Sequence, residues 1–135
     1  MGAITKASVT LTTRNYLGES KMRNHFAVID EPVDRGGDNN GPTPVEYLLT
    51  AIGGCVSMTL RMYAERKNWD VGKITVNVIQ KEKLTPNGVE KLLLEEISFE
   101  KETTEEQRMK LLEIAGKCPV AKMVKDETPI SSKII

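Results

Sequence analysis

Residues 43–67 (TPVEYLLTAIGGCVSMTLRMYAERK) constrain the fold of this chain more than any other segment. Apolar side chains recur there at helical spacing on two neighbouring faces, and the first basic residue among them is Arg61. Thr43 can cap the first turn, Pro44 suits the first helical position, and Glu46 can close a capping box with Thr43. The pattern predicts a long helix that is central and buried, because most of its circumference is apolar.

Patterns outside this segment predict further strands and helices. The strands are expected over residues 3–13, 25–29, 72–84, 90–101 and 130–135, and the helices over a segment that opens at Thr103 or Thr104 and over 119–125. Strands 3–13 and 25–29 are expected to pair as one hairpin, and the next two strands as another around Pro86-Asn87-Gly88. Residues 31–44, with three Pro and three Gly, predict an ordered loop. This order predicts a single α+β domain over residues 1–135, with the long helix laid on an antiparallel sheet.

The charge of the chain excludes several classes of partner. The 135 residues include 19 basic and 19 acidic side chains, so the formal net charge is zero. A neutral chain has no electrostatic footprint for nucleic acid or for an anionic membrane, and it favours self-association. No stretch approaches the about 18 apolar residues of a membrane-spanning helix, and the N-terminal segment lacks the apolar core of a signal peptide. We therefore expect a cytoplasmic protein with no nucleic-acid or membrane partner.

The chain has only two cysteines and one histidine, which limits the kinds of site that it can form. They are too few for a disulfide-rich scaffold or a Cys/His zinc site, so we expect no metal, and we expect no cofactor. Cys55 follows Gly53-Gly54 inside the predicted helix, where each glycine costs about 1 kcal/mol and usually marks a close approach. Cys118 precedes Pro119 at a predicted helix start, where unpaired amides favour a thiolate. Each cysteine is either a small buried apolar residue or part of a thiol site.

Two segments around these cysteines carry a resemblance to a known family. The segment GPTPVEYLLTAIGGCVSMTL (41–60) is followed by a strand and then by KCPVAKMV (117–124). This arrangement resembles the OsmC/Ohr family of thiol peroxidases, and most closely its OsmC-like branch with the P-x-E-x-L-L-x-A-x-G-G-C helix. The resemblance covers the whole chain. It implies an OsmC-like fold, in which antiparallel sheets wrap around a long central helix, and an intertwined homodimer with two sites at the interface.

The resemblance also implies a reaction. In the family, the helix cysteine reduces hydroperoxides, preferably organic ones, and becomes a sulfenic acid that a second cysteine resolves as a disulfide. Carried onto this chain, Cys55 is the attacking thiolate and Cys118 is the resolving thiol. The implied partners are a small apolar hydroperoxide as substrate and a dithiol as reductant, in defence against oxidative stress.

An arginine and a glutamate have supporting roles in the family, where the Arg favours the thiolate and the Glu holds the Arg. Arg35 lies ahead of the helix at the spacing that the OsmC-like branch uses, and Arg14 is the competing candidate. Peroxidase members carry the Glu directly after the helix proline, where this chain has Val45. Glu46 follows one position later, which rotates its side chain by about 100° around the helix. Glu46 is therefore either a site residue or only the capping partner of Thr43.

Val45 leaves other functions open. The chain is alternatively a non-catalytic OsmC-like dimer that binds an apolar small molecule in the same pocket, or a sulfur-handling dimer in which Cys55 carries a persulfide. Met58 and Met62, on the helix of Cys55, fit either an adaptable apolar pocket or ordinary core packing. Oxidation of the two thiols by an organic hydroperoxide distinguishes the enzyme from these alternatives.

Overall fold

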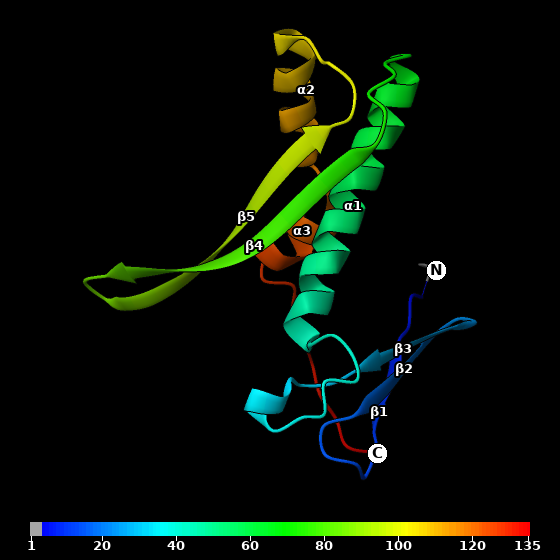
Figure 1. Cartoon of the computed structure of the whole chain (residues 1–135), viewed down its shortest axis with the longest axis vertical. Coiled ribbons are helices and arrows are strands. Elements are labelled where there is room, and N and C mark those ends of the chain that lie inside the picture. The colour runs from blue at the N-terminus through cyan, green and yellow to red at the C-terminus, as the bar shows by residue number, and fades with distance from the viewer. Residues whose placement is uncertain (1–3) are drawn as a thin grey trace. The chain divides into compact units, whose positions relative to one another are not determined.

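The computed structural model describes residues 4–135 and has mixed α and β structure with antiparallel sheets, as predicted (Figure 1). In chain order the elements are β1 (Ser8–Leu11), β2 (Gly18–Met22), β3 (His25–Ile29), the 3-10 helix η1 (Val33–Arg35), α1 (Pro44–Arg66), β4 (Ile74–Thr85), β5 (Gly88–Phe99), α2 (Glu105–Ala115) and α3 (Pro119–Lys125). The chain forms two compact units, one up to Leu48 and one from Leu49 onward. The single domain expected over residues 1–135 therefore stays a prediction.

The first unit contains a three-stranded antiparallel sheet in the order β1-β2-β3. The direct pairing predicted between residues 3–13 and 25–29 is wrong, because β2 lies between β1 and β3 and pairs with both. The sequence of β2, GESKM, has no apolar alternation, so its strand depends on the two neighbours that bond to it. Residue 3 of the predicted strand lies outside the described residues, and residues 4–7 are not in a strand.

Asp30 orders the loop that follows β3. Its side chain is buried, and its carboxylate accepts hydrogen bonds from the backbone N–H groups of Glu31, Asp38 and Asn40 at 2.8, 3.3 and 3.0 Å. These bonds, above all the one from Asn40, hold the pKa of Asp30 below its ordinary value. Backbone hydrogen bonds, such as that from the Gly37 N–H to the Pro32 carbonyl, also order this loop, which carries Arg35 at the end of η1.

The long helix α1 begins at Pro44, as the capping pattern predicts. The N–H of Glu46 donates to Thr43 Oγ1 at 3.2 Å, and the N–H of Thr43 donates to Glu46 Oε1 at 2.9 Å. In the second unit one face of α1 is buried in a core shared with β4, β5, α2 and α3. That face consists of Ile52, Val56, Leu60, Tyr63 and Ala64. Met58 and Met62 are 64% and 63% exposed, so a single chain covers only part of the helix that we predict to be buried.

β4 and β5 form a long antiparallel hairpin whose tip projects away from α1 (Figure 1). Pro86 and Asn87 make the turn between them, as the sequence predicts. Gly88 begins β5 with a φ of 114°, a conformation that residues with a Cβ rarely adopt.

Two further predictions concern the start of α2 and the C-terminal segment 130–135. Thr104 and Gln107 form the capping box of α2, which selects Thr104 over Thr103 as the residue that opens this helix. The strand predicted over 130–135 is wrong. This segment is irregular, its isoleucines are exposed, and none of the described strands pairs with it. A strand needs a neighbouring edge to bond its backbone, whatever its apolar content.

Candidate functional site: the thiol pair

Cys55 lies in the middle of α1 and is half-buried. The two glycines before it have different surroundings. A Cβ on Gly53 would lie 3.3 Å from Val78 Cγ2, so this glycine lets α1 approach β4 closely. A Cβ on Gly54 would meet no atom within 4 Å. The close approach that the Gly-Gly pair predicts is therefore present at Gly53, whereas the space beside Gly54 is open.

Cys118 is the N-cap residue of α3 and is fully buried in the core of the second unit. Its Sγ accepts a hydrogen bond from the Ala121 N–H at 3.5 Å. Cys55 packs against the buried cluster that contains Cys118, and each thiol affects the pKa of the other. The two cysteines, separated by most of the second unit in sequence, thus meet where α1 passes the start of α3.

The two thiols have opposite acidities. Partial burial opposes ionisation of Cys55, but hydrogen bonds with the Cys118 thiol, the Val120 N–H and the Thr59 hydroxyl outweigh it and lower the pKa of Cys55. Burial, together with the hydrogen bond to Cys55, raises the pKa of Cys118. The lowered pKa that we expect for Cys118 at a helix start is wrong, because its burial outweighs the amides beside it.

Arg35 and Glu46 belong to the first unit. Hydrogen bonds with the Thr43 backbone and side chain lower the pKa of Glu46, and the charge of Arg35 adds a smaller contribution. No ion pair joins Arg35 to Glu46 within residues 4–135, so the charge of Arg35 affects Glu46 only weakly. Arg14 instead faces Asp38, with 3.6 Å between Arg14 Nε and the carboxylate. The roles of Arg35 and Glu46 toward Cys55 stay predictions.

Thr59 and the Val120 N–H both lower the pKa of Cys55, and we do not predict either of them from the sequence. Thr59 was detectable in principle, because positions four apart on a helix lie on the same face. The Val120 amide was not, because its approach depends on how α3 packs against α1.

An open groove of about 1050 Å³ lies along α1 and α2, and its lining includes Thr59 together with the cations Arg66, Lys67, Lys110 and Lys117. We call it the cationic groove. Glu65 is the one acidic residue in its lining. The lining of the groove is therefore mainly positive, and neither cysteine is part of it.

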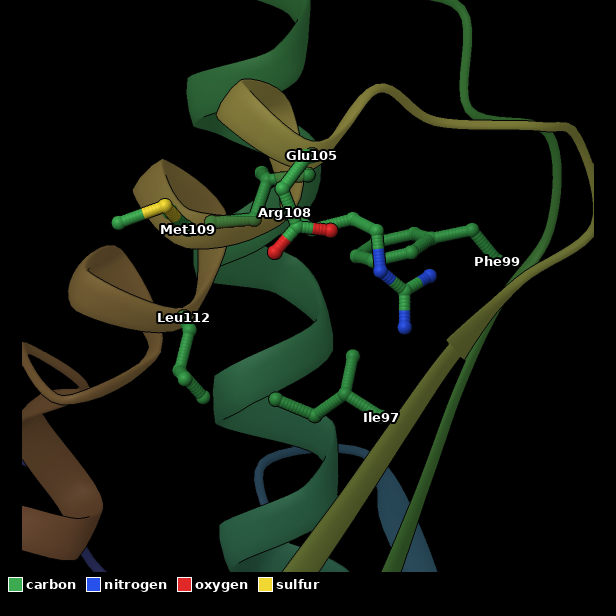
Figure 2. A pocket seen from close by; sticks show the side chains of 7 residues that line it. Ile97, Phe99, Glu105, Arg108, Met109 and Leu112 are labelled. Atoms are coloured by element: carbon green, nitrogen blue, oxygen red, sulfur yellow. The ribbon is translucent and has the colours of Figure 1, made fainter.

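A separate, smaller cavity of about 220 Å³ lies between the end of β5 and α2. Figure 2 shows Ile97 and Phe99 on one side, Met109 and Leu112 on the other, and the charged ends of Glu105 and Arg108 between them. Neither cysteine lines this cavity. The thiol pair therefore lies outside this cavity.

Among residues 4–135, no helix is long and apolar enough to cross a membrane. No group of three or more His, Cys, Asp or Glu side chains in that range could hold a metal ion.

Comparison with known proteins identifies the class to which this fold and thiol pair belong. The family model described as "OsmC-like protein" matches residues 37–133, which is more than two thirds of the chain. The chain therefore belongs to the OsmC-like protein family. No curated protein matches the chain.

Several solved structures have a similar fold, although their sequence identity to this chain is low. An osmotic stress induced and detoxification response protein from Psychrobacter arcticus 273-4 is 22% identical, with a TM-score of 0.75 and coverage of 90% of this chain and 89% of that one. An OsmC like protein from Mycoplasma pneumoniae is 19% identical, with a TM-score of 0.71 and coverage of 93% and 89%. An organic hydroperoxide resistance protein from Elizabethkingia anophelis is 20% identical, with a TM-score of 0.68 and coverage of 91% and 89%.

Proposed function

We propose that this chain is a thiol peroxidase that reduces organic hydroperoxides in the cytoplasm, in defence against oxidative stress. The observation that carries the proposal is that the half-buried Cys55 packs against the core cluster that contains the fully buried Cys118. Structural relatives from Elizabethkingia anophelis and Legionella pneumophila are described as organic hydroperoxide resistance proteins, which supports this substrate class.

The proposed reaction has three steps. The Cys55 thiolate attacks the terminal oxygen of the hydroperoxide, the O–O bond breaks, and the organic part takes up a proton and leaves as an alcohol. The resulting sulfenic acid is attacked by the sulfur of Cys118, which forms the disulfide and releases water. A dithiol then reduces the disulfide, returns both thiols, and leaves as its own disulfide.

The acidities of the two thiols support this division of roles. A lowered pKa gives Cys55 a larger thiolate fraction, and the thiolate is the form that attacks peroxides. A raised pKa keeps Cys118 protonated and therefore less reactive toward oxidants. Cys55 packs against the core cluster that contains Cys118, which supports a resolving role for Cys118.

We propose Arg35 as the cation that supports the thiolate and Glu46 as the carboxylate that holds Arg35. An arginine suits this role because it is always charged and can bind a carboxylate with two donors. The electrostatic interaction between Arg35 and Glu46 supports the pairing. The capping bonds of Glu46 to Thr43 are compatible with it, because they use one carboxylate oxygen.

We also propose that the protein is a homodimer in which α1 packs against its counterpart in a second copy. Ala51, Cys55, Met58 and Met62 lie on one stripe of α1 at helical spacing, and all of them except Cys55 are exposed. Light scattering at micromolar concentration should give twice the mass of one chain. The mass of a single chain would contradict the dimer.

Trapping the first oxidised species tests the peroxidase. The Cys118→Ser variant should form a sulfenic acid on Cys55 after one equivalent of cumene hydroperoxide, and dimedone should label it on the peptide that contains Cys55. Cys55→Ser is the matched control and should take up no label. If Cys55 stays reduced at doses that oxidise a known thiol peroxidase, the peroxidase proposal is wrong, and the binding or sulfur-handling dimer takes its place.

A further inference from the structure

The cationic groove concentrates positive charge in a chain that has no net charge. Its lining contains the four cations Arg66, Lys67, Lys110 and Lys117 and the one carboxylate Glu65, so the net charge of the lining is +3. The whole chain has equal numbers of basic and acidic residues. The groove is therefore a local excess of positive charge, and neither thiol lines it.

These cations come from separate parts of the second unit. Arg66 ends α1 and Lys67 follows it, whereas Lys110 lies in the middle of α2 and Lys117 lies between α2 and α3. The dipole of a helix favours a cation near its C-terminal end, but this effect fades within one turn and does not account for Lys110. The fold, rather than a run of basic residues in the sequence, thus places these charges around one groove.

Most of this positive charge is not neutralised by the chain itself. Among residues 4–135, no ion pair involves Arg66, Lys67 or Lys117. Lys110 has one carboxylate partner, Glu113 on the same helix, at 3.5 Å. Like charges that are gathered in this way repel one another and lower the stability of the fold. An anion in the groove would remove that repulsion.

Tyr63 orients two of the cations at the groove. The Arg66 guanidinium and the Lys67 ammonium group each lie 5.7 Å from the centre of the Tyr63 ring, a distance at which a cation is attracted to an aromatic face. Tyr63 is buried and packs edge-to-face against Trp69, with 5.7 Å between the ring centres. Two cations of the groove are therefore positioned before any ligand binds.

We propose that the cationic groove binds a small anion that carries two linked phosphate groups. At neutral pH a diphosphate has a charge of about −3, which matches the net charge of the lining. Arginine binds phosphate through two parallel N–H donors, and lysine binds it as a point charge. The volume of about 1050 Å³ is near the upper end for small-molecule sites, so an organic group fits beside the diphosphate.

Isothermal titration calorimetry with inorganic pyrophosphate tests this proposal. We expect saturable binding with a dissociation constant below about 1 mM, and binding of orthophosphate at the same ionic strength should be at least about tenfold weaker. ADP distinguishes two sources of the same chemistry. Tighter binding of ADP than of pyrophosphate indicates a nucleoside diphosphate, and equal or weaker binding indicates the diphosphate group alone. Absence of saturable binding by both compounds would overturn the proposal.

Substitutions in the groove locate the binding. Arg66→Met and Lys110→Met should each raise the dissociation constant of pyrophosphate by about three- to tenfold, and they lie on different helices, so one remains informative if the other does not fold. Lys91→Met on β5 removes the same charge outside the lining and should stay within about twofold of wild type. Equal weakening in all three variants, or none in either groove variant, would contradict a site in the groove.

The fluorescence of Trp69, the only tryptophan of the chain, reports binding next to Tyr63. Pyrophosphate should change this fluorescence with the dissociation constant found by calorimetry, and binding without such a change would place the anion elsewhere and contradict the proposal. A hexaglutamate peptide that binds where pyrophosphate does not would assign the groove to an acidic protein segment instead, and would also overturn the proposal. No thiol takes part in these measurements, so an inactive peroxidase would leave their results unaffected.

Discussion

Cys55 and Cys118 carry the same functional group in opposite surroundings. Cys55 is half-buried in the middle of a long helix, whereas Cys118 is fully buried at the start of a short one. Position in a helix alone would make Cys118 the more acidic thiol. The structure reverses this order, because hydrogen bonds lower the pKa of Cys55 and burial raises that of Cys118. Thiol acidity here depends on which donors reach each sulfur and on how much water is removed.

The largest expected effect concerns turnover. Cys55→Ser should reduce hydroperoxide consumption by at least about a thousandfold, because a serine hydroxyl is not ionised at neutral pH. Cys118→Ser should consume one equivalent of hydroperoxide and then stop when a dithiol that reduces only disulfides is supplied. Peroxide consumption with time checks both. If neither variant consumed the first equivalent of hydroperoxide, the assignment of different roles to the two thiols would be contradicted.

The next effect concerns the reactivity of the native thiols. In the wild-type protein, iodoacetamide should alkylate Cys55 at least about a hundredfold faster than Cys118 at pH 7, because Cys118 reacts only when the core opens. Quantitative mass spectrometry of the two cysteine peptides gives the ratio. Addition of urea above the unfolding midpoint should bring the two rates together, and a ratio near one without urea would contradict the account.

A smaller effect tests whether a cation, in addition to uncharged hydrogen-bond donors, lowers the pKa of Cys55. If Arg35 supports the thiolate, Arg35→Met should lower the alkylation rate of Cys55 at pH 7 by about three- to tenfold. Arg14→Met is the matched control and should stay within about twofold of wild type. Parental rates in both variants would assign the acidity of Cys55 to its hydrogen bonds alone.

The smallest effect is a pair of opposite changes in stability with pH. The lowered pKa of Cys55 contributes stability above the pKa of the unfolded thiol, and this contribution is lost as pH falls through the folded value. The raised pKa of Cys118 contributes stability below the unfolded pKa, and this contribution is lost as pH rises through the folded value.

Urea unfolding under reducing conditions measures both changes. Between pH 7 and pH 9.5, the stability of wild type relative to Cys55→Ala should rise, whereas its stability relative to Cys118→Ala should fall. Trends of the same sign would contradict the opposite acidities of the two thiols.

Local patterns predict much of this fold. The capping boxes at Thr43 and Thr104 and the turn at Pro86 each depend on residues within a few positions of one another, and the structure contains all three. The errors lie in the strands. β2 has no apolar pattern and depends on its neighbours, and the segment 130–135 has the apolar pattern but no partner strand among those described.

The site could be predicted only in part for the same reason. The motif around Cys55 and the Cys-Pro step at Cys118 single out the two thiols, which the fold then brings together. The approach of Val120 to Cys55 and the complete burial of Cys118 come from the packing of α3 on α1, which no short pattern encodes. The acidity of Cys118 is therefore the property that the sequence predicts incorrectly.

The most direct test of the central claim is disulfide mapping of the wild-type protein after one equivalent of cumene hydroperoxide. The account predicts a loss of two hydrogens from the intact chain and a single cross-linked pair of peptides that joins Cys55 to Cys118. A dithiol should reverse both changes. Two free thiols after this treatment, or a Cys55 that oxidises to sulfinic acid beside a reduced Cys118, would contradict it.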